Sequence, residues 1–417
     1  METASAHSDA STTCTFCGLL CDDLALSWRD GALASAERAC AKARRGFEAV
    51  LKPAQTSIDG VPSSLEAALD AAAAILAKSK RPLIAGLGTD VAGMRAALAL
   101  GERCGAVLDH LHGEAMARQL RVLQSRGLTL TTLGEVRNRA DLVVLLGVDL
   151  NQDFPRFAER CIAPVDTLAP SRTDQRRVFH VGPANTRPRL ETPAISQIPC
   201  PQEQLADMLQ VLRALHRGRT TQAPARTRKL LQPLVEAIKE AEYTVFVWAP
   251  GQLDPGSADL TIAGACELIS DLNQKSRAAG LSLGGNDGGQ SALAASAWIT
   301  GYPLPVSFTG PQLAHDPITL RSSALLASND VDALVWVSTF SDRLPPDTTL
   351  PRIVIGNAGS LQPGPGTLCL AAGTPGVDHA GQLIRTDGVV ALPVQRLLER
   401  GLPSAAAILN ALLARLG

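Results

Sequence analysis

The chain has 417 residues, a length typical of two or three domains rather than one. Hydrophobic residues make up 46% of it and charged residues 19%, which is enough apolar material for a sizeable core and too little charge for wholesale disorder. The 39 basic and 40 acidic residues leave a net charge of −1, and only 3% of residues are aromatic. This balance gives no support to nucleic-acid binding or to docking on an acidic membrane as the main task.

The sequence predicts no export or membrane insertion. No run of about 18 apolar residues is present that would predict a transmembrane helix. Met1–Thr13 is small and polar, and it lacks the basic region followed by an apolar one that marks a secretory signal. A cytoplasmic location is therefore expected, in which the nine cysteines are reduced thiols or metal ligands rather than disulfides.

Residues 1–55 form a cysteine-rich head, in which Cys14, Cys17 and Cys21 are followed by Cys40. Three thiols this close can converge on one inorganic centre, and the fourth can complete its shell. Cubane iron–sulfur clusters need four such ligands, whereas zinc also accepts four thiolates, and a set of buried cysteines is the third alternative. The tight spacing favours descent from a metal site. The remaining cysteines lie in apolar neighbourhoods and are predicted to be small buried residues: Cys104, Cys161, Cys200, Cys266 and Cys369.

Residues 56–217 are predicted to form a first α/β domain. Ser63 and Glu66 offer a capping box at the start of a helix, and a second helix is expected to end near Cys104. Short apolar runs bounded by glycine or charge predict buried parallel strands in this range. These strands are Pro82–Gly86, Asp141–Leu146 and Arg177–Val181.

Residues 218–417 repeat the alternation as a second α/β domain with a C-terminal segment. A helix is predicted over Ala258–Leu272. The predicted strands are Thr244–Trp248, Ala333–Val337 and Arg352–Gly356, with shorter ones near Thr367–Ala371 and Val389–Leu392. Strands that alternate with helices imply parallel sheets covered on both faces, so the predicted fold class is α/β with Rossmann-like units.

Two glycine-rich segments are candidates for holding a cofactor phosphate. Gly86–Gly93 follows a predicted strand and opens a helix, although its last spacing is too long for the dinucleotide fingerprint Gly-x-Gly-x-x-Gly. Gly284–Gly289 offers many backbone amides and little side-chain bulk. The alternatives are a tight strand-to-helix turn, with Gly86–Gly88 as the exit from the strand, for the first segment and a flexible loop for the second.

Several motifs together resemble the B subunit of formylmethanofuran dehydrogenase, a member of the molybdopterin oxidoreductases. The head, with Cys14-Thr-Phe-Cys17-Gly-Leu-Leu-Cys21-Asp-Asp and then Cys40-Ala-Lys42, is similar to the head of that protein. Further similar stretches span nearly the whole chain: Gly147–Asp149, Phe154–Arg156, Trp298–Pro303, Gly376–Asp378, Arg385–Val389 and Leu402–Ser404. Two departures from the family pattern are Leu150, in place of a proline, and Phe154, in place of a histidine. The resemblance implies a molybdopterin oxidoreductase type of fold and a four-iron cluster held by Cys14, Cys17, Cys21 and Cys40.

The decisive departure lies in the segment Leu108–Gly113. The family carries Cys-His-Gly after its second strand, and this cysteine binds the molybdenum or tungsten of a bis-pterin cofactor. Here Leu111 stands in the place of the cysteine, and leucine has no lone pair to offer a metal. The resemblance then implies no molybdenum or tungsten pterin in this chain. It leaves His112, which matches the family histidine beside the metal, as a relic rather than a catalytic residue, and His110 is not expected to ligate from its shifted position.

Two functions follow from the resemblance. In the leading hypothesis the chain is the non-redox B subunit of the formyltransferase/hydrolase complex of methylotrophic bacteria. That complex moves a formyl group from tetrahydromethanopterin to a methanofuran-like carrier and hydrolyses it to formate in formaldehyde oxidation, a branch of one-carbon metabolism. Because hydrolysis needs no electrons, loss of the metal is tolerated there. The chain would then be a pseudoenzyme with a structural or carrier-guiding role, bound to A-, C- and D-type subunits and possessing no nucleic-acid or membrane partner.

The alternative is a catalytic formylmethanofuran dehydrogenase subunit that interconverts CO2 and formate at molybdenum or tungsten. Its support is the full set of four cysteines and the presence of His112. A cluster-bearing electron-transfer subunit is a third possibility. The sequence leaves open whether a [4Fe-4S] cluster still occupies the head, and whether the chain has an enzymatic activity of its own.

Overall fold

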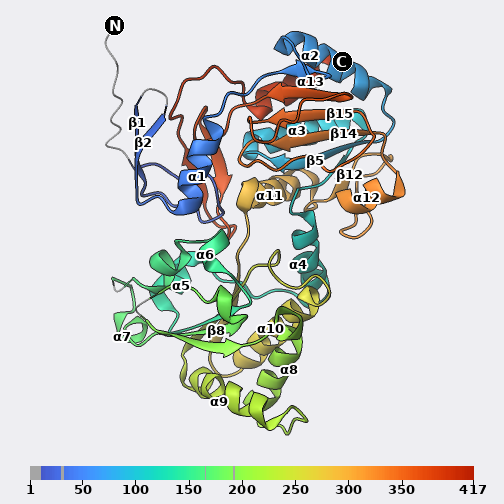
Figure 1. Ribbon diagram of the computed structural model, residues 1–417. Helices are drawn as coiled ribbons and strands as arrows, with labels where there is room; N and C mark the ends of the chain where they lie inside the picture. The colour runs from blue at the N-terminus through green and yellow to red at the C-terminus, as the bar shows by residue number, and fades with distance from the viewer. Residues whose placement is uncertain (1–10, 30–31, 165, 191–192) are drawn as a thin grey trace. The chain divides into compact units, whose positions relative to one another are not determined.

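The computed structural model describes residues 11–29, 32–164, 166–190 and 193–417. Most of the segment Met1–Thr13, in which no secretory signal is predicted, and with it the first ten residues of the head, therefore lies outside the described residues. The chain divides into two compact units (Figure 1): unit 1 consists of Met1–Glu114 and Gly285–Gly417, and unit 2 of Ala115–Gly284. Within the described ranges, no helix combines the length and the apolar character needed to cross a membrane.

Unit 1 is built on a nine-stranded sheet with a parallel centre. The strand order is β13-β12-β6-β5-β14-β15-β16-β3-β4, and the run from β6 to β16 is parallel. The central strands β5, β14 and β16 are buried along their whole length, as expected for a parallel sheet covered on both faces. The strands are β3 (Ser57–Ile58), β4 (Val61–Pro62), β5 (Pro82–Gly88), β6 (Val107–Leu108), β12 (Val306–Ser307), β13 (Ala314–His315), β14 (Ala333–Ser338), β15 (Arg352–Gly356) and β16 (Thr367–Ala371).

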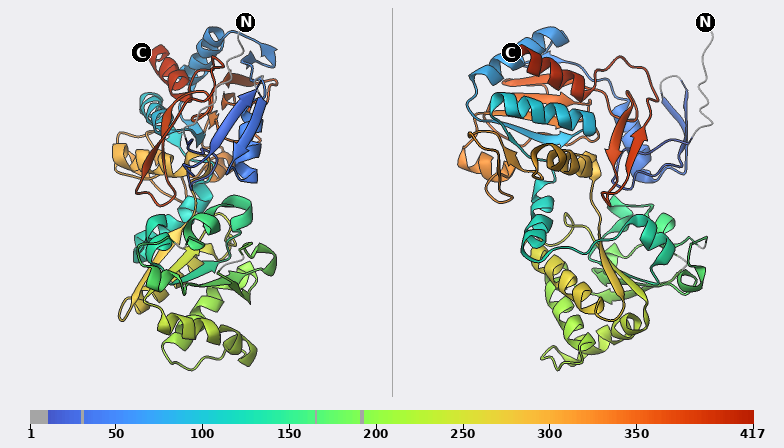
Figure 2. Two further views of the ribbon diagram at one scale, coloured as in Figure 1. Left: turned by 90° about the vertical axis from the view of Figure 1, so that its left-hand side faces the viewer. Right: turned by 180° about the vertical axis from the view of Figure 1, so that it is seen from behind.

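Helices cover both faces of this sheet. One face packs against α2 (Leu65–Lys78), α3 (Val91–Cys104), α11 (Gly289–Thr300) and α13 (Ala405–Arg415). In Figure 2, the view from behind shows α13 (red) and α3 (cyan) in front of the sheet. The other face packs against α12 (Ser322–Ser328) and its flanking residues. Side chains of β5 alternate between the two layers, with Ile84 and Leu87 in the first and Leu83 and Ala85 in the second.

The rest of unit 1 consists of short elements. The head holds the antiparallel pair β1 (Ala25–Arg29) and β2 (Ala32–Glu37), followed by α1 (Ala41–Val50). A second antiparallel pair, β17 (Gly381–Ile384) and β18 (Ala391–Val394), lies in the C-terminal segment. The 3-10 turn η4 (Asn286–Gly288) directly precedes α11.

Unit 2 contains a five-stranded, wholly parallel sheet in the order β11-β10-β7-β8-β9. An apolar core joins the sheet to α8, α9 and α10. The strands are β7 (Leu142–Leu146), β8 (Arg177–Gly182), β9 (Ile195–Pro199), β10 (Tyr243–Trp248) and β11 (Arg277–Ser282). The helices are α4 (Gly113–Arg126), α5 (Leu133–Arg139), α6 (Leu150–Asp153), η1 (Ala158–Ile162), α7 (Pro170–Thr173), η2 (Ala184–Thr186), η3 (Gln202–Gln204), α8 (Leu205–His216), α9 (Ala225–Glu240) and α10 (Ala258–Leu272).

A buried arginine ties the short helices of unit 2 together. Arg176 is only 4% exposed, and burial lowers its pKa to about 10. Its guanidinium donates hydrogen bonds to five backbone carbonyls, those of Val136, Arg137, Ala140, Cys161 and Ile162. These carbonyls lie in or just beyond α5 and η1, so one side chain satisfies the acceptors that two helix ends leave open.

The predicted α/β class with parallel sheets is confirmed, and most predicted strands and helices occur within a residue or two of their expected bounds. Two local predictions are wrong. The helix cap is Ser64 rather than Ser63, because the Ser64 hydroxyl accepts from the Ala67 amide (3.2 Å) while the Ser63 amide donates to Thr56. The proposed exit turn Gly86–Gly88 is instead the last part of β5, which bulges at positive φ and continues.

The structure also divides the chain differently from the predicted ranges 56–217 and 218–417. Strand β5, from the first predicted domain, pairs with β14, from the second, while β7 pairs with β10 in the other unit. The reason is that residues 115–284 are inserted within the chain of unit 1. Alternation of helices and strands does not reveal such an insertion, because both units have the same local pattern.

Candidate functional site

The topology of unit 1 points to one edge of its sheet. Strand β6 follows β5 on one side, whereas β15 and β16 follow β14 on the other, so the strand order reverses between β5 and β14. In open α/β sheets, ligands bind outside the carboxyl ends of the strands at such a reversal. The segment His110–Gly113 leaves the carboxyl end of β6, next to β5. Fold topology and sequence therefore indicate the same place.

Leu111 is packed into the apolar layer at this edge. Its amide donates to the Gly86 carbonyl (2.9 Å), and its side chain packs against the cluster that contains Leu83 and Trp336. A Cβ on Gly88 would lie 3.7 Å from Leu111 Cδ2, which is ordinary contact distance. The position where the family places its metal-binding thiol is thus occupied by a packed alkyl group. The residues present do not fit a molybdenum or tungsten centre.

The histidines on either side of Leu111 are both committed to Asp287. The His112 Nε2 and Asp287 Oδ2 atoms are 3.0 Å apart, and the His110 Nε2 lies 3.1 Å from the Asp287 carbonyl. The His112 amide donates to His110 Nδ1 (3.0 Å). Because Nδ1 of His110 accepts, its Nε2 carries the proton and donates to the carbonyl, which fixes the neutral tautomer.

The pKa values of this cluster follow from its burial. Burial, together with the neighbouring His112, lowers the pKa of His110 to about 3. Burial alone would raise the pKa of Asp287, but the hydrogen bond and charge of His112 lower it to about 2. The carboxylate of Asp287 is therefore ionised and the ring of His110 is neutral at pH 7.

Asp109 anchors the start of the same segment. One carboxylate oxygen accepts from the His110 amide (2.9 Å), and the other accepts from the amide (2.7 Å) and the hydroxyl (2.8 Å) of Ser322. Burial raises the pKa of Asp109 to about 6, although the hydrogen bonds from Ser322 oppose the rise. Both carboxylate oxygens of Asp109 accept hydrogen bonds from the protein itself. Its raised pKa therefore belongs to a residue that joins two segments, not to a general base.

The glycine-rich segments are shaped by close packing. Gly288 has a φ of +69°, and a Cβ there would lie 2.2 Å from the Thr89 carbonyl oxygen, so only glycine fits. Asp287 itself has a φ of +53°. At the other segment, the Asp90 carboxylate caps the first turn of α3 by accepting from the Gly93 amide (2.9 Å). A carboxylate already satisfies that helix start, which favours a tight strand-to-helix turn, at Thr89 and Asp90 rather than at Gly86–Gly88, over a phosphate site.

The four head cysteines lie close to one another. The Cys14 amide donates to the Cys21 carbonyl (2.7 Å), which closes the loop, and the ring of Phe16 packs edge-on against Phe47 of α1 (4.8 Å between centroids). Cys40 is the N-cap of α1, and its Sγ accepts from the Ala43 amide (3.5 Å). The loop therefore packs against the helix whose first turn carries the fourth cysteine.

Electrostatics at the head oppose bare thiolates. Burial raises the pKa of the Cys14 thiol well above its usual range, and the neighbouring Cys17, Cys21 and Cys40 raise it further. A cationic centre would be needed to deprotonate such a set, as in metal–thiolate sites. Across the described ranges, no three His, Cys, Asp or Glu side chains are arranged to hold a metal ion. Both the cluster and the zinc alternative remain predictions.

The other five cysteines belong to packed surroundings. Cys161, Cys200 and Cys369 are buried, whereas Cys104 and Cys266 are partly exposed. Burial raises the pKa of the Cys200 thiol to about 12, and that of both Cys104 and Cys266 to about 11. These three thiols stay protonated at neutral pH, as expected for packing residues.

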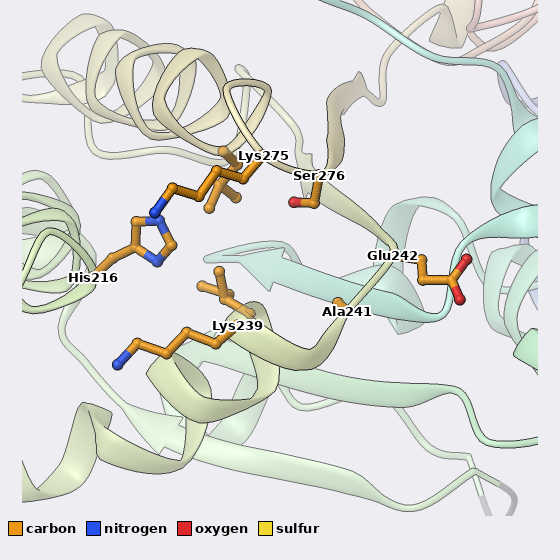
Figure 3. A pocket seen from close by; sticks show the side chains of 8 residues that line it. His216, Lys239, Ala241, Glu242, Lys275 and Ser276 are labelled. Atoms are coloured by element: carbon orange, nitrogen blue, oxygen red, sulfur yellow. The ribbon is translucent and has the colours of Figure 1, made fainter.

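The sequence did not predict a cavity of about 570 Å³ in unit 2 (Figure 3). It is lined mainly by residues at the ends of α8, α9 and α10, among them His216, Lys239 and Lys275. Cationic side chains commonly lie at helix C-termini, where they complement the partial negative charge of the open carbonyls. The cavity also borders the amino ends of β10 and β11, opposite the edge at which α/β sheets bind ligands. It is therefore not a candidate active site.

Comparison with known proteins matches this architecture. No protein-family model matches the chain. The Fhc B subunit of the formyltransferase/hydrolase complex of Methylorubrum extorquens is 30% identical over 334 residues, which cover 78% of this chain and 87% of that protein. The B subunit of tungsten-containing formylmethanofuran dehydrogenase 2 is 24% identical over 345 residues in Methanococcus maripaludis and 25% identical over 348 residues in Methanocaldococcus jannaschii. These matches cover 79% of this chain in both cases, and 79% and 78% of the respective relatives.

A solved structure agrees with the sequence relatives. The crystal structure of the formyltransferase/hydrolase complex FhcABCD from Methylorubrum extorquens, in complex with methylofuran, contains a chain that matches with a TM-score of 0.73 and 27% identity. The match covers 87% of this chain and 98% of that one. The resemblance drawn from the sequence motifs is thus confirmed over most of the chain. The chain belongs to the family of B subunits that includes those of the formyltransferase/hydrolase complex and of formylmethanofuran dehydrogenase.

Proposed function

We propose that this chain is the non-redox B subunit of a formyltransferase/hydrolase complex, with a structural or carrier-guiding role. Such a complex converts formyl-tetrahydromethanopterin, by way of formyl-methanofuran, to formate in formaldehyde oxidation. The observation that carries the proposal is Leu111. An alkyl side chain stands in the ligand position, and it is packed into the apolar layer of the sheet rather than directed into an open coordination site.

The contacts around Leu111 support the same view. His110 and His112 are both engaged by Asp287, and the Gly288 backbone lies directly against Thr89 at the carboxyl end of β5. Protein groups therefore meet one another at the edge where a related enzyme would bind its cofactor. A subunit without a redox centre fits a hydrolytic reaction, because formyl transfer and hydrolysis move no electrons.

The relatives support the assembly. The solved relative is part of a complex of four different subunits with methylofuran bound. We infer A-, C- and D-type partner subunits and a methanofuran-like carrier for this chain. A cytoplasmic location and a molybdopterin oxidoreductase type of fold are part of the proposal, on the strength of the family relationship and the two parallel sheets.

The head is proposed to retain the capacity for a [4Fe-4S] cluster. Its ligands would be Cys14, Cys17 and Cys21, whose thiols are close enough to raise the pKa of Cys14, and Cys40, the N-cap of α1. Four soft thiolates are the donor set that such a cluster requires, and a bound cluster would stabilise the head by linking the loop to the helix. This role is structural, since no redox partner is needed for it.

The alternative function is a catalytic dehydrogenase subunit. It is favoured by the two relatives named as tungsten-containing formylmethanofuran dehydrogenase and by the presence of all four head cysteines. That function would require a metal centre bound without any protein thiolate at position 111.

Elemental analysis of the purified complex decides between the two. We expect no molybdenum or tungsten above trace, and full formyltransferase/hydrolase activity in complexes that contain this chain. Iron near four atoms per chain with a broad visible absorption would support the cluster, and a Cys14→Ser variant should then lose both signals. Stoichiometric molybdenum or tungsten would refute the non-redox proposal. Unchanged stability and activity of the complex without this chain would refute the structural role.

A further inference from the structure

Residues 288–315 of unit 1 contain no Asp, Glu, Lys or Arg, although 19% of the whole chain is charged. Large apolar side chains in this stretch are nevertheless exposed: Trp298 is 65%, Ile299 53% and Tyr302 44% exposed. Depletion of charge and enrichment of Trp and Tyr distinguish the buried centres of protein interfaces from ordinary surface. The composition of this exposed region is therefore that of an interface.

Helix α11 has no charged face of the kind that suits a surface helix to water. Its twelve residues are all uncharged, and the helix lacks the apolar stripe opposite a charged face that surface helices show. Its Ala292 and Ala295 pack in the core of unit 1, while Trp298 and Ile299 extend from its last turn into solvent. An uncharged helix end that exposes large apolar side chains is normally covered by another surface.

Local contacts hold the end of α11 and the Tyr302 ring in place. The Thr300 hydroxyl donates to the Ser296 carbonyl (2.8 Å), and the Ser296 hydroxyl donates to the Tyr302 carbonyl (2.9 Å). The Tyr302 ring stacks on His315 of the edge strand β13, with 5.6 Å between centroids and 15° between planes. A ring that is already held loses little entropy when a partner binds, so Tyr302 is organised in advance for binding.

These exposed residues, together with a nearby one in sequence, are termed the α11 surface. It comprises Trp298, Ile299, Tyr302, the stacked His315 and, three residues further on, Ile318, which is 50% exposed. Polar groups begin beside it, with Asp316 accepting from the Ile318 amide (2.8 Å) and the Thr319 hydroxyl (2.7 Å). An apolar aromatic centre with a polar rim is the arrangement of binding hot spots.

We propose that the α11 surface docks another subunit of the hetero-oligomeric complex, one that presents an apolar, uncharged surface of its own. The inference rests on the proposed function, because it takes this chain to be part of such a complex. A charged partner surface would lose hydration against this region without gaining any opposite charge. A lipid surface is disfavoured because the stretch lacks the Lys and Arg residues that bind anionic headgroups. The solved relative assembles with three different subunits, which supplies partners of the kind proposed.

The test uses the full chain co-expressed with its A-, C- and D-type subunits, with a tag on this chain. Trp298→Ala and Ile299→Glu should each weaken the capture of a partner about 30-fold or more, the effect of removing an interface hot spot. Leu260→Glu is the matched control, since Leu260 is also an exposed apolar helix residue (61%) but lies on α10 of unit 2. Unchanged circular dichroism and thermal midpoints would show that the variants fold.

The outcomes separate the two proposals. Assembly of the wild-type chain and the control, with loss of one subunit from both α11-surface variants, supports the docking site. Equal assembly of all four proteins overturns the docking site and leaves the proposed function standing. Loss of self-association alone, measured by sedimentation, would assign the surface to a second copy and overturn the inference. Failure of the wild-type chain to assemble would overturn the proposed function and the docking site together.

Discussion

Lowering the pH should destabilise unit 1 through His110. Its neutral ring accepts at Nδ1 from the His112 amide and donates at Nε2 to the Asp287 carbonyl, so protonating Nδ1 breaks a bond inside a buried cluster. The folded pKa of about 3 lies below the ordinary value of 6.5, so the unfolded state binds the proton first. The free energy of unfolding that unit 1 gains from neutral His110 is fully present above pH 6.5. It falls as the pH drops toward 3, by roughly 5 kcal/mol at most.

The measurement has to report on unit 1 alone, because a chain of two units does not unfold in one step. Hydrogen exchange of the buried β5 amides at pH 7, 6 and 5 gives the opening free energy of that unit. Between pH 7 and 5 we expect wild type to lose about 2 kcal/mol more than a His110→Gln variant, which cannot titrate. Burial raises the pKa of Asp109, which opposes this trend equally in both proteins, so the difference isolates His110. Parallel pH profiles for wild type and variant would refute the reasoning.

Three further changes test the packing. Arg176→Lys should lower the free energy of unfolding of unit 2 by about 3 kcal/mol in urea titrations, because three donors cannot serve five carbonyls. The control Arg177→Lys should lower it by less than about 1 kcal/mol, because Arg177 is only partly buried and binds one carbonyl, that of Ala237, and the Glu240 carboxylate. Equal losses of stability in the two variants would contradict a stabilising role for the five hydrogen bonds of Arg176. Gly288→Ala should destabilise unit 1 by about 2 kcal/mol or more, and Gly284→Ala, with open space around it, should be neutral in thermal melts. Leu111→Ala should cost about 1–2 kcal/mol; no loss would mean that its side chain packs against nothing.

Local pattern predicted most elements of the fold correctly. The helix Ala258–Leu272 and the strands Arg352–Gly356 and Thr367–Ala371 have the expected bounds, because each is an apolar run between clear turn or cap signals. The division of the chain was not predictable in this way. Which strands pair depends on contacts between residues more than 200 positions apart, as between β5 and β14, and a single sequence carries no sign of them.

The candidate site was predictable only in part. The departure at Leu111 was visible from the family pattern, and the structure adds that the side chain is packed. The partner of the two histidines, Asp287, was missed although it lies inside the predicted glycine-rich segment. A signal was present, since an aspartate between Asn286 and two glycines is a residue type that tolerates positive φ. The function of that segment lies in its single charged side chain rather than in its backbone amides.

The insertion of residues 115–284 within unit 1 has a consequence for how the protein is made. On the ribosome, β5 and β6 emerge long before β14 and β12, the strands that flank them. Strand β5 is buried along its whole length in the finished protein, and its edge toward β14 stays unpaired until all of the inserted unit has been translated. Unit 2 is continuous in sequence and can complete its sheet first. Nascent chains that stall between residues 115 and 284 therefore expose an incomplete, aggregation-prone sheet. They should depend on chaperones more than the released protein does.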